Sequence, residues 1–134
     1  MTLEVAEHLE PQSAETFVKS LTGAADLILF GAAYPHQGGP KHVNEKPHTY
    51  WAGLFAQHEY RPFDILRPTF WGDDTIPFWY RQNTFLYARQ GSSAYDNLVS
   101  QSLQPMQNVW FMDCVHPQLY LCKIADIAGL KESS

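Results

Sequence analysis

The chain has 134 residues, 45% hydrophobic and 14% aromatic, and this length and composition predict one small domain with a hydrophobic core. Its net charge is −5 with a pI near 5.6, and the few basic residues are scattered, which excludes nucleic acid as an expected partner. The longest apolar run, 27–34, is far shorter than the roughly 20 residues of a membrane-spanning helix, and no signal peptide is recognisable. Cys114 and Cys122 form no CxxC pair, which disfavours a disulfide framework or a structural zinc site. We therefore expect a soluble cytoplasmic protein with no membrane partner.

The first third of the chain predicts a strand, a helix and a second strand. Residues 1–5 are apolar enough to end a buried strand, and residues 14–25 repeat apolar side chains at helical spacing. Pro11 or Ser13 would start this helix and Gly23 would end it. Residues 26–33 are continuously apolar after the aspartate, which is typical of a strand covered on both faces in a parallel sheet.

A long polar loop over 34–48 follows, and loops of this length usually hold function or disorder. Thr49 is predicted to cap a short helix that ends before Pro62. Residues 63–66 and 84–88 favour two further strands, separated by an aromatic segment with a turn signal at 72–74. The elements up to residue 90 thus predict an α/β sheet of about four strands flanked by helices.

Beyond residue 90 the pattern weakens, and residues 91–134 are interpreted as a carboxyl-terminal extension. Leu119, Tyr120, Ile124 and Ile127 recur at helical spacing and predict a terminal helix. We expect this helix either to pack back on the domain or to mediate association.

Three segments carry a family resemblance, in this order: Leu3-Glu4-Val5-Ala6-Glu7-His8-Leu9; residues 30–51 with Gly38-Gly39-Pro40-Lys41-His42-Val43-Asn44-Glu45; and residues 64–83 with Arg67-Pro68, Trp71 and Trp79-Tyr80-Arg81-Gln82-Asn83. Together they resemble the carboxyl-terminal half of a Rossmann-like S-adenosylmethionine-dependent methyltransferase, over roughly residues 1–90. The resemblance implies a partial methyltransferase sheet, mixed, with the final strand inserted antiparallel between its neighbours. It also implies S-adenosylmethionine as cofactor, with Glu4, Val5 and His8 beside its methionine portion.

The glycine-rich turn that this family uses to hold the nucleotide is not found. Gly38-Gly39 lies in a loop without repeated glycine spacing, and it favours a hinge or a tight turn. We therefore expect weak or absent cofactor binding by this chain alone. The first strand is expected at an open sheet edge, and such edges invite partners. A homo-oligomer or a separate amino-terminal half would complete the sheet there.

The loop over 34–48 holds the candidate catalytic residues. By the resemblance, this loop faces the substrate beside the transferred methyl group, with His42 and Glu45 as catalytic residues and Gln37 and Asn44 as substrate-binding residues. An oxygen or nitrogen acceptor can require a base, and a neutral imidazole or a carboxylate serves that purpose. In the alternative interpretation, Asn44 and Glu45 cap the following turn and His42 is solvated.

Other candidate residues are open to two interpretations. Aromatic rings could line a pocket for a small-molecule acceptor or pack in the core; the candidates are Tyr50, Trp51, Trp71, Trp79 and Tyr80. Glu7 and His8 could instead form a solvated first helical turn. The spacing of His42, Glu45 and His48 would suit a metal on a helix, but Pro47 argues against a helix there, so no metal is predicted.

Three functions remain open from the sequence. The chain could be the substrate-side portion of a methyltransferase, inactive until a cofactor-binding half completes it. It could be a non-catalytic interaction or oligomerisation module derived from such an enzyme. It could also be a fragment that folds by oligomerising and has no task of its own.

Overall fold

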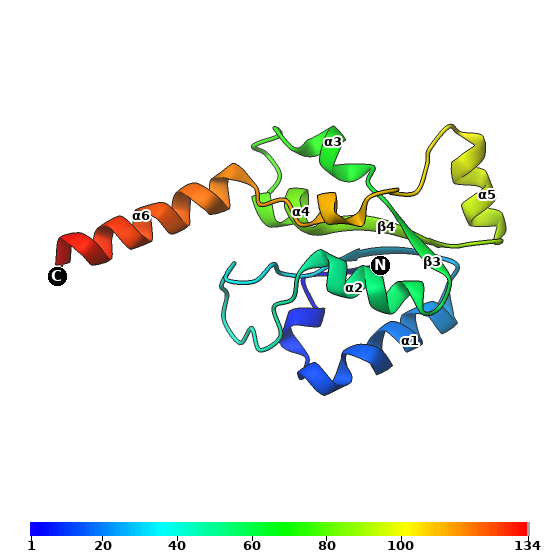
Figure 1. Cartoon of the computed structure of the whole chain (residues 1–134), viewed down its shortest axis with the longest axis horizontal. Coiled ribbons are helices and arrows are strands. Elements are labelled where there is room, and N and C mark those ends of the chain that lie inside the picture. Colours follow the sequence, from blue (N-terminus) through cyan, green and yellow to red (C-terminus); the bar gives the residue numbers. More distant parts are fainter. Residues whose placement is uncertain (134) are drawn as a thin grey trace.

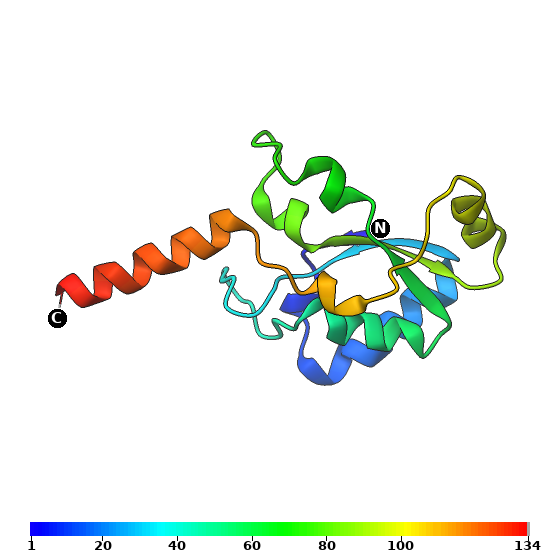
Figure 2. The same cartoon turned by 45° about the horizontal axis from the view of Figure 1, so that its top comes forward.

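The structure is a computed structural model that describes residues 1–133, with side chains over residues 1–130. Its elements in chain order are β1 (Thr2–Leu3), η1 (Ala6–His8), η2 (Pro11–Ser13), α1 (Ala14–Ala24), β2 (Leu27–Gly31), α2 (His48–Ala56), β3 (Tyr60–Phe63), α3 (Leu66–Phe70), α4 (Phe78–Asn83), β4 (Thr84–Arg89), α5 (Ser93–Ser100), η3 (Val109–Met112) and α6 (Pro117–Ser133). Helices α1 and α2 cover one face of the sheet, and α3 and α4 lie on the other (Figures 1 and 2).

The four strands form one mixed sheet in the order β1-β2-β4-β3. β1 and β2 are parallel, whereas β4 runs antiparallel to both β2 and β3. β1, β2 and β3 therefore share one direction and only β4 opposes them. The predicted α/β fold with a mixed sheet and one antiparallel strand is confirmed, and this strand is inserted between its neighbours.

Local features differ from the sequence prediction at three places. β2 has a parallel neighbour on one side only, because β4 occupies the other side. The strand predicted over 63–66 is wrong, since β3 lies at Tyr60–Phe63 and Leu66 begins α3. Pro62 is tolerated within β3 because this strand pairs only with β4 and lies at the sheet edge.

Thr49 does not cap the helix that follows the long loop. The N-cap position of α2 is occupied by Pro47, which makes no side-chain capping bond, and the backbone N–H of Thr49 donates to Oδ1 of Asp113 at 3.3 Å. The Thr49 hydroxyl instead donates a hydrogen bond of 2.7 Å to the carboxylate of Asp113, far along the chain. A tertiary contact thus takes the place of the predicted local cap.

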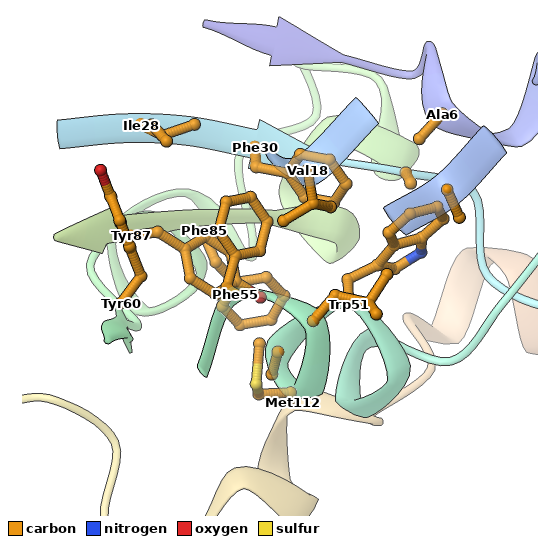
Figure 3. Close-up of a cluster of buried hydrophobic side chains, with 14 residues drawn as sticks. Ala6, Val18, Ile28, Phe30, Trp51, Phe55, Tyr60, Phe85, Tyr87 and Met112 are labelled. Atoms are coloured by element: carbon orange, nitrogen blue, oxygen red, sulfur yellow. The ribbon is translucent and has the colours of Figure 1, made fainter. Parts of the chain in front are cut away.

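The core lies between the sheet and helices α1 and α2, and it is dominated by aromatic rings (Figure 3). The ring of Phe55 stacks on Tyr87 with centroids 4.0 Å apart, and Phe30 meets Phe55 edge to face at 5.2 Å. Trp51 from α2 and Met112 from η3 are also buried in this cluster. The predicted extension after residue 90 therefore supplies part of the core.

Arg67 in α3 connects this helix to η3 through hydrogen bonds. Its guanidinium donates to the carboxylate of Asp64 and to the backbone carbonyls of Phe111 and Met112, at 2.6 and 2.9 Å for the two carbonyls. It also lies over the ring of Phe85, with 4.7 Å to the centroid. Because Arg67 is buried, these bonds satisfy a charge that would otherwise be costly.

The predicted terminal helix is present as α6, which extends away from the rest of the molecule (Figure 1). Leu119 is buried at its start, whereas Tyr120, Ile124 and Ile127 are exposed. Burial of an apolar side chain is thus confined to the first turn among the described residues, although Lys123 lies near Gly38, and a role in association stays a prediction. No helix in the described part of the chain is long and apolar enough to cross a bilayer.

The aromatic core predicts the effect of a single truncation. Phe55→Ala should lower the free energy of unfolding by about 3–5 kcal/mol, because it removes a fully buried ring from the stack with Tyr87. Urea denaturation followed by circular dichroism measures this change. Phe111→Ala is the matched control, since this ring is 65% exposed and its loss should cost less than about 1 kcal/mol. Equal losses in both variants would contradict the assignment of the core.

Candidate functional site

The candidate site is a cleft at the carboxyl ends of β1 and β2. Because these strands are parallel, the residues that follow each of them meet at one edge of the sheet. The cleft has a volume of about 270 Å³. Its walls are formed by Glu4, Glu7, His8, Gln37, Gly38, Gly39, Pro40, His42 and Trp79. Ligands of open α/β sheets bind at such carboxyl edges.

A hydrogen-bonded network holds the floor of the cleft together. The side-chain amide of Asn83 donates to Glu4 Oε1 at 2.9 Å and to Gln37 Oε1 at 2.8 Å. Gln37 Nε2 donates in turn to Glu4 Oε2 at 3.3 Å. Three segments that are distant in sequence therefore meet at the carboxyl group of Glu4. Glu4 itself adopts a left-handed backbone with φ of 54°, a strained conformation of the kind found at functional sites.

Burial raises the pKa of Glu4 to about 7, the hydrogen bond from Asn83 opposes this shift, and the neighbouring charge of Glu7 adds to it. The cleft therefore contains a carboxyl group that exchanges its proton close to neutral pH. Such a group is typical of functional sites.

The loop after β2 is fixed over η1 by its backbone. The carbonyl of Glu7 accepts hydrogen bonds from the N–H groups of Val43 and Asn44, at 2.9 and 3.0 Å. Gly39 has φ of +148°, and a Cβ there would lie 2.5 Å from the ring of His42. Only glycine fits this close approach. The predicted turn at Gly38-Gly39 thus allows the imidazole to lie against the backbone.

His42 and Glu45 form a hydrogen-bonded pair. His42 Nδ1 lies 2.8 Å from Glu45 Oε1, and the same oxygen accepts the N–H of Gly38 at 3.0 Å. The side chain of His42 is only 11% exposed. Glu45 therefore caps no helix and His42 is not solvated. The alternative interpretation of this loop, in which Glu45 caps the following turn and His42 is solvated, is wrong. Because a carboxylate accepts at Nδ1, the neutral form of this ring carries its proton on Nδ1 and its lone pair on Nε2.

Glu7 is the most unusual group in the cleft. Its side chain is fully buried, and neither carboxyl oxygen has a hydrogen-bond partner among the described residues. Nε2 of His42 lies 3.8 Å from its Oε1, and the carboxyl group of Glu4 is a second ionisable neighbour. The interpretation of Glu7 as part of a solvated turn is therefore wrong, whereas the neighbouring His8 is exposed.

Of the predicted site residues, the structure brings together Glu4, His8, Gln37, His42, Glu45 and Trp79. The others lie outside the cleft. Val5 is exposed, and Asn44 is buried with no hydrogen-bond partner for its side-chain amide among the described residues. Tyr50 packs edge-on against Trp51, which is a core residue.

Two predicted aromatic residues line other hollows. Trp71 packs on His116 with ring centroids 4.6 Å apart, and Tyr80 lines an apolar hollow with Leu3 and Leu29. Trp79 is thus the one predicted aromatic side chain that the cleft contains. The role of these rings in acceptor binding stays a prediction.

His48 is remote from the cleft chemistry. Its ring packs between Tyr34 and Phe85, with centroids 5.1 and 5.2 Å away. Burial, together with the charge of Arg67, lowers the pKa of His48 to about 3, so it is neutral under ordinary conditions. It therefore belongs to the packing of α2, and the spacing of three between His42, Glu45 and His48 brings no metal ligands together.

Two side chains that shape the cleft, Glu7 in its wall and Asn83 beneath it, were not among the predicted site residues. Glu7 lies in a short segment whose sequence does not tell a buried turn from an exposed one. Asn83 ends a run of three buried polar residues, Arg81, Gln82 and Asn83, immediately before a strand. Such a run at a strand end is unusual for a core and could have pointed to this edge of the sheet.

Comparisons with known protein families, with curated proteins and with solved structures found no match to this chain. Any function must therefore be argued from the fold and from the cleft itself.

The raised pKa of Glu4 predicts a pH-dependent stability. Between its ordinary value of 4.5 and about 7, the folded chain holds a proton that the unfolded chain has lost. Stability is therefore fully present below pH 4.5 and falls as pH rises to 7, by up to about 3 kcal/mol. Glu4→Gln, which resembles the protonated carboxyl, should remove this loss.

Urea titrations of both proteins across pH 4 to 8, with a chelator present, measure the difference. His48 acts in the opposite direction, because its lowered pKa reduces stability as pH falls below 6.5. This contribution is common to both proteins and cancels when they are compared. Parallel stability curves for the two proteins would contradict the assignment of the raised pKa to Glu4.

Proposed function

We propose that this chain is the substrate-side portion of an S-adenosylmethionine-dependent methyltransferase, completed by a cofactor-binding half. The observation that carries the proposal is the convergence of residues after β1 and after β2 in one cleft that contains a histidine–carboxylate pair. The sheet supports it, since β4 is inserted antiparallel as the resemblance implies.

The cleft suits the cationic amino-acid end of the cofactor. Glu4 and Glu7 place two carboxyl groups in its wall, and Glu7 makes no hydrogen bond that a cation would have to break. We assign Glu4, Gln37 and His8 to this end of the molecule. Bound S-adenosylmethionine would supply an electrophilic methyl group on a positively charged sulfonium. The described residues offer no glycine-rich turn for the nucleoside. The backbone N–H of Gly38 already donates a hydrogen bond to Glu45 and is not free to bind a ligand.

His42 is proposed to remove the proton of an oxygen or nitrogen acceptor. Glu45 holds Nδ1 and orients the ring, so that Nε2 accepts the proton and the carboxylate stabilises the imidazolium that forms. Gly39 contributes by letting the ring lie against the loop. Trp79 offers a flat apolar surface on which a small acceptor could lie.

The cofactor-binding half is proposed to join at β1. This strand ends the sheet order and pairs only with β2 in the described part of the chain. Edge strands with a free side accept a further strand from another chain. A second copy of this chain and a separate polypeptide are the two partners that this edge admits. We place the protein in the reducing cytoplasm, where Cys114 and Cys122 would remain free thiols as the structure has them.

A non-catalytic interaction module is the second candidate. It is favoured by the exposed apolar side chains of α6, namely Tyr120, Leu121, Ile124 and Ile127, on a helix that extends away from the domain. Such side chains on an extended helix mark protein contacts. A concentration-dependent mass in sedimentation, lost when Leu121 and Ile124 are replaced by serine, would favour this candidate.

Cofactor recognition is tested by nuclear magnetic resonance of the labelled chain with a chelator present. Millimolar S-adenosylmethionine should shift the amide resonances of Glu4, His8 and Gln37, because the cleft offers carboxyl groups to its cationic end. Adenosine should leave these resonances in place, since no nucleoside cradle lines the cleft. Shifts confined to another surface, or no shift with S-adenosylmethionine, would contradict the proposed cofactor side.

Catalysis is tested in a preparation in which this chain, joined to its cofactor-binding half, transfers a labelled methyl group from S-adenosylmethionine to an acceptor. His42→Ala should lower the rate by about 10²–10⁴, the usual contribution of a general base, with folding unchanged. His36→Ala is the matched control, since this histidine lies in the same loop and is not among the residues of the cleft wall. A rate unchanged in His42→Ala would remove His42 from the proposed role.

A further inference from the structure

We propose that Glu7, His8 and His42 bind a divalent transition-metal ion in the cleft. One ligand atom from each residue lies within 4.8 Å of the other two. This inference goes beyond the proposed methyl transfer and does not depend on it, because it is argued from the ligand geometry of these three side chains and is tested without a methyl donor.

Both imidazoles are prepared as ligands by their own hydrogen bonds. His8 Nδ1 lies 3.2 Å from the backbone carbonyl of Lys41, and a carbonyl can only accept, so the proton is on Nδ1. His42 Nδ1 is held in the same way by the carboxylate of Glu45. The neutral form of each ring therefore has its lone pair on Nε2. A metal-bound histidine almost always has its other nitrogen fixed by a carbonyl or carboxylate in this manner.

The carboxylate of Glu7 is the independent sign of a cation. It is fully buried and faces the cleft without a hydrogen-bond donor among the described residues. An unpaired buried carboxylate is costly, and the cost is removed when a metal ion coordinates it. No lysine or arginine side chain pairs with Glu7 in the part of the chain that the structure describes.

The distances between the three ligand atoms are somewhat longer than in a metal-bound site, so the side chains would have to move closer together when the ion binds. Ligand atoms around a tetrahedral zinc ion lie roughly 3.4 Å apart, given bonds of about 2.1 Å. Glu7 Oε1 and His42 Nε2 are already 3.8 Å apart. The rings of His8 and His42 meet edge to face at 4.8 Å, so the exposed His8 ring is the one that must move. His8 has room for this movement because it lies at the surface.

The ligand set identifies the class of ion. Two imidazoles and one carboxylate suit Zn²⁺, Fe²⁺, Co²⁺ or Mn²⁺, whereas Mg²⁺ and Ca²⁺ prefer oxygen ligands alone. Three protein ligands leave at least one coordination position open, as in catalytic rather than structural zinc sites. In the metal-bound chain His42 is a ligand, and the ion would lower the pKa of an acceptor oxygen bound at the open position.

The experiment uses the untagged chain, freed of metal with a chelator and then dialysed. Calorimetric titration with Zn²⁺ and the visible absorption of the Co²⁺ complex should both report one ion per chain, and excess Mg²⁺ should not displace it. Glu7→Gln and His8→Ala should each weaken Zn²⁺ binding more than about 100-fold. Glu45→Gln should weaken it about 10–100-fold, since it only orients His42. His58→Ala, a histidine outside the cleft wall, should have no effect.

Circular dichroism verifies that each variant is folded, and His8→Ala is the decisive variant because His8 is exposed and bears little of the packing. The proposal is overturned if the folded chain binds no Zn²⁺ or Co²⁺ with saturation. It is equally overturned if Glu7→Gln and His8→Ala bind as tightly as the unaltered chain. Neither result bears on the amide shifts caused by S-adenosylmethionine, because those are recorded with a chelator present.

Discussion

The cleft depends on the hydrogen bonds that Asn83 donates to Glu4 and Gln37. Asn83 is buried where α4 meets β4, and its own carbonyl oxygen accepts from Gln82, whose carbonyl accepts the backbone N–H of His116 at the root of α6. One chain of amides therefore connects the end of β1, the loop after β2, the start of β4 and the start of α6. Because each amide has a partner, the strained backbone of Glu4 is held in place by its surroundings.

The two carboxyl groups of the cleft are placed in contrasting environments. Glu4 is surrounded by amide donors and still holds its proton close to neutral pH, since burial outweighs those bonds. Glu7 has no amide or hydroxyl donor among the described residues and only the carboxyl group of Glu4 and the ring of His42 beside it, although it is more deeply buried. A protein that needed only stability would gain from an apolar side chain at this position. A cation bound in the cleft would offset the cost of a carboxylate there, and the two proposals above each supply one: the methyl donor or a metal ion.

The sequence predicts an element well where its apolar residues recur at one regular spacing. It predicts poorly where a contact with a distant segment determines the local structure. Helix α1 and strand β4 follow their apolar spacing within a residue or two, and the mixed sheet followed from the family resemblance. β3 was misplaced because Pro62 was interpreted as a break, whereas an edge strand tolerates it. The burial of Glu7 was missed because it arises from the loop that folds over η1, and local sequence does not encode that contact. His42 and Glu45 were named on the family resemblance, and the structure shows that their side chains form a hydrogen-bonded pair.

The antiparallel insertion of β4 explains why the site forms at this edge and nowhere else along β2. Gly31, the last residue of β2, pairs with Thr84, the first residue of β4. The start of β4 therefore lies beside the ends of β1 and β2, and the residue before it, Asn83, reaches Glu4. Had β4 been parallel to β2, its start would lie at the opposite end of the sheet and no amide would meet the carboxyl group. Strand direction, rather than the loop sequence alone, thus determines whether the polar residues after β1 and β2 become one cleft.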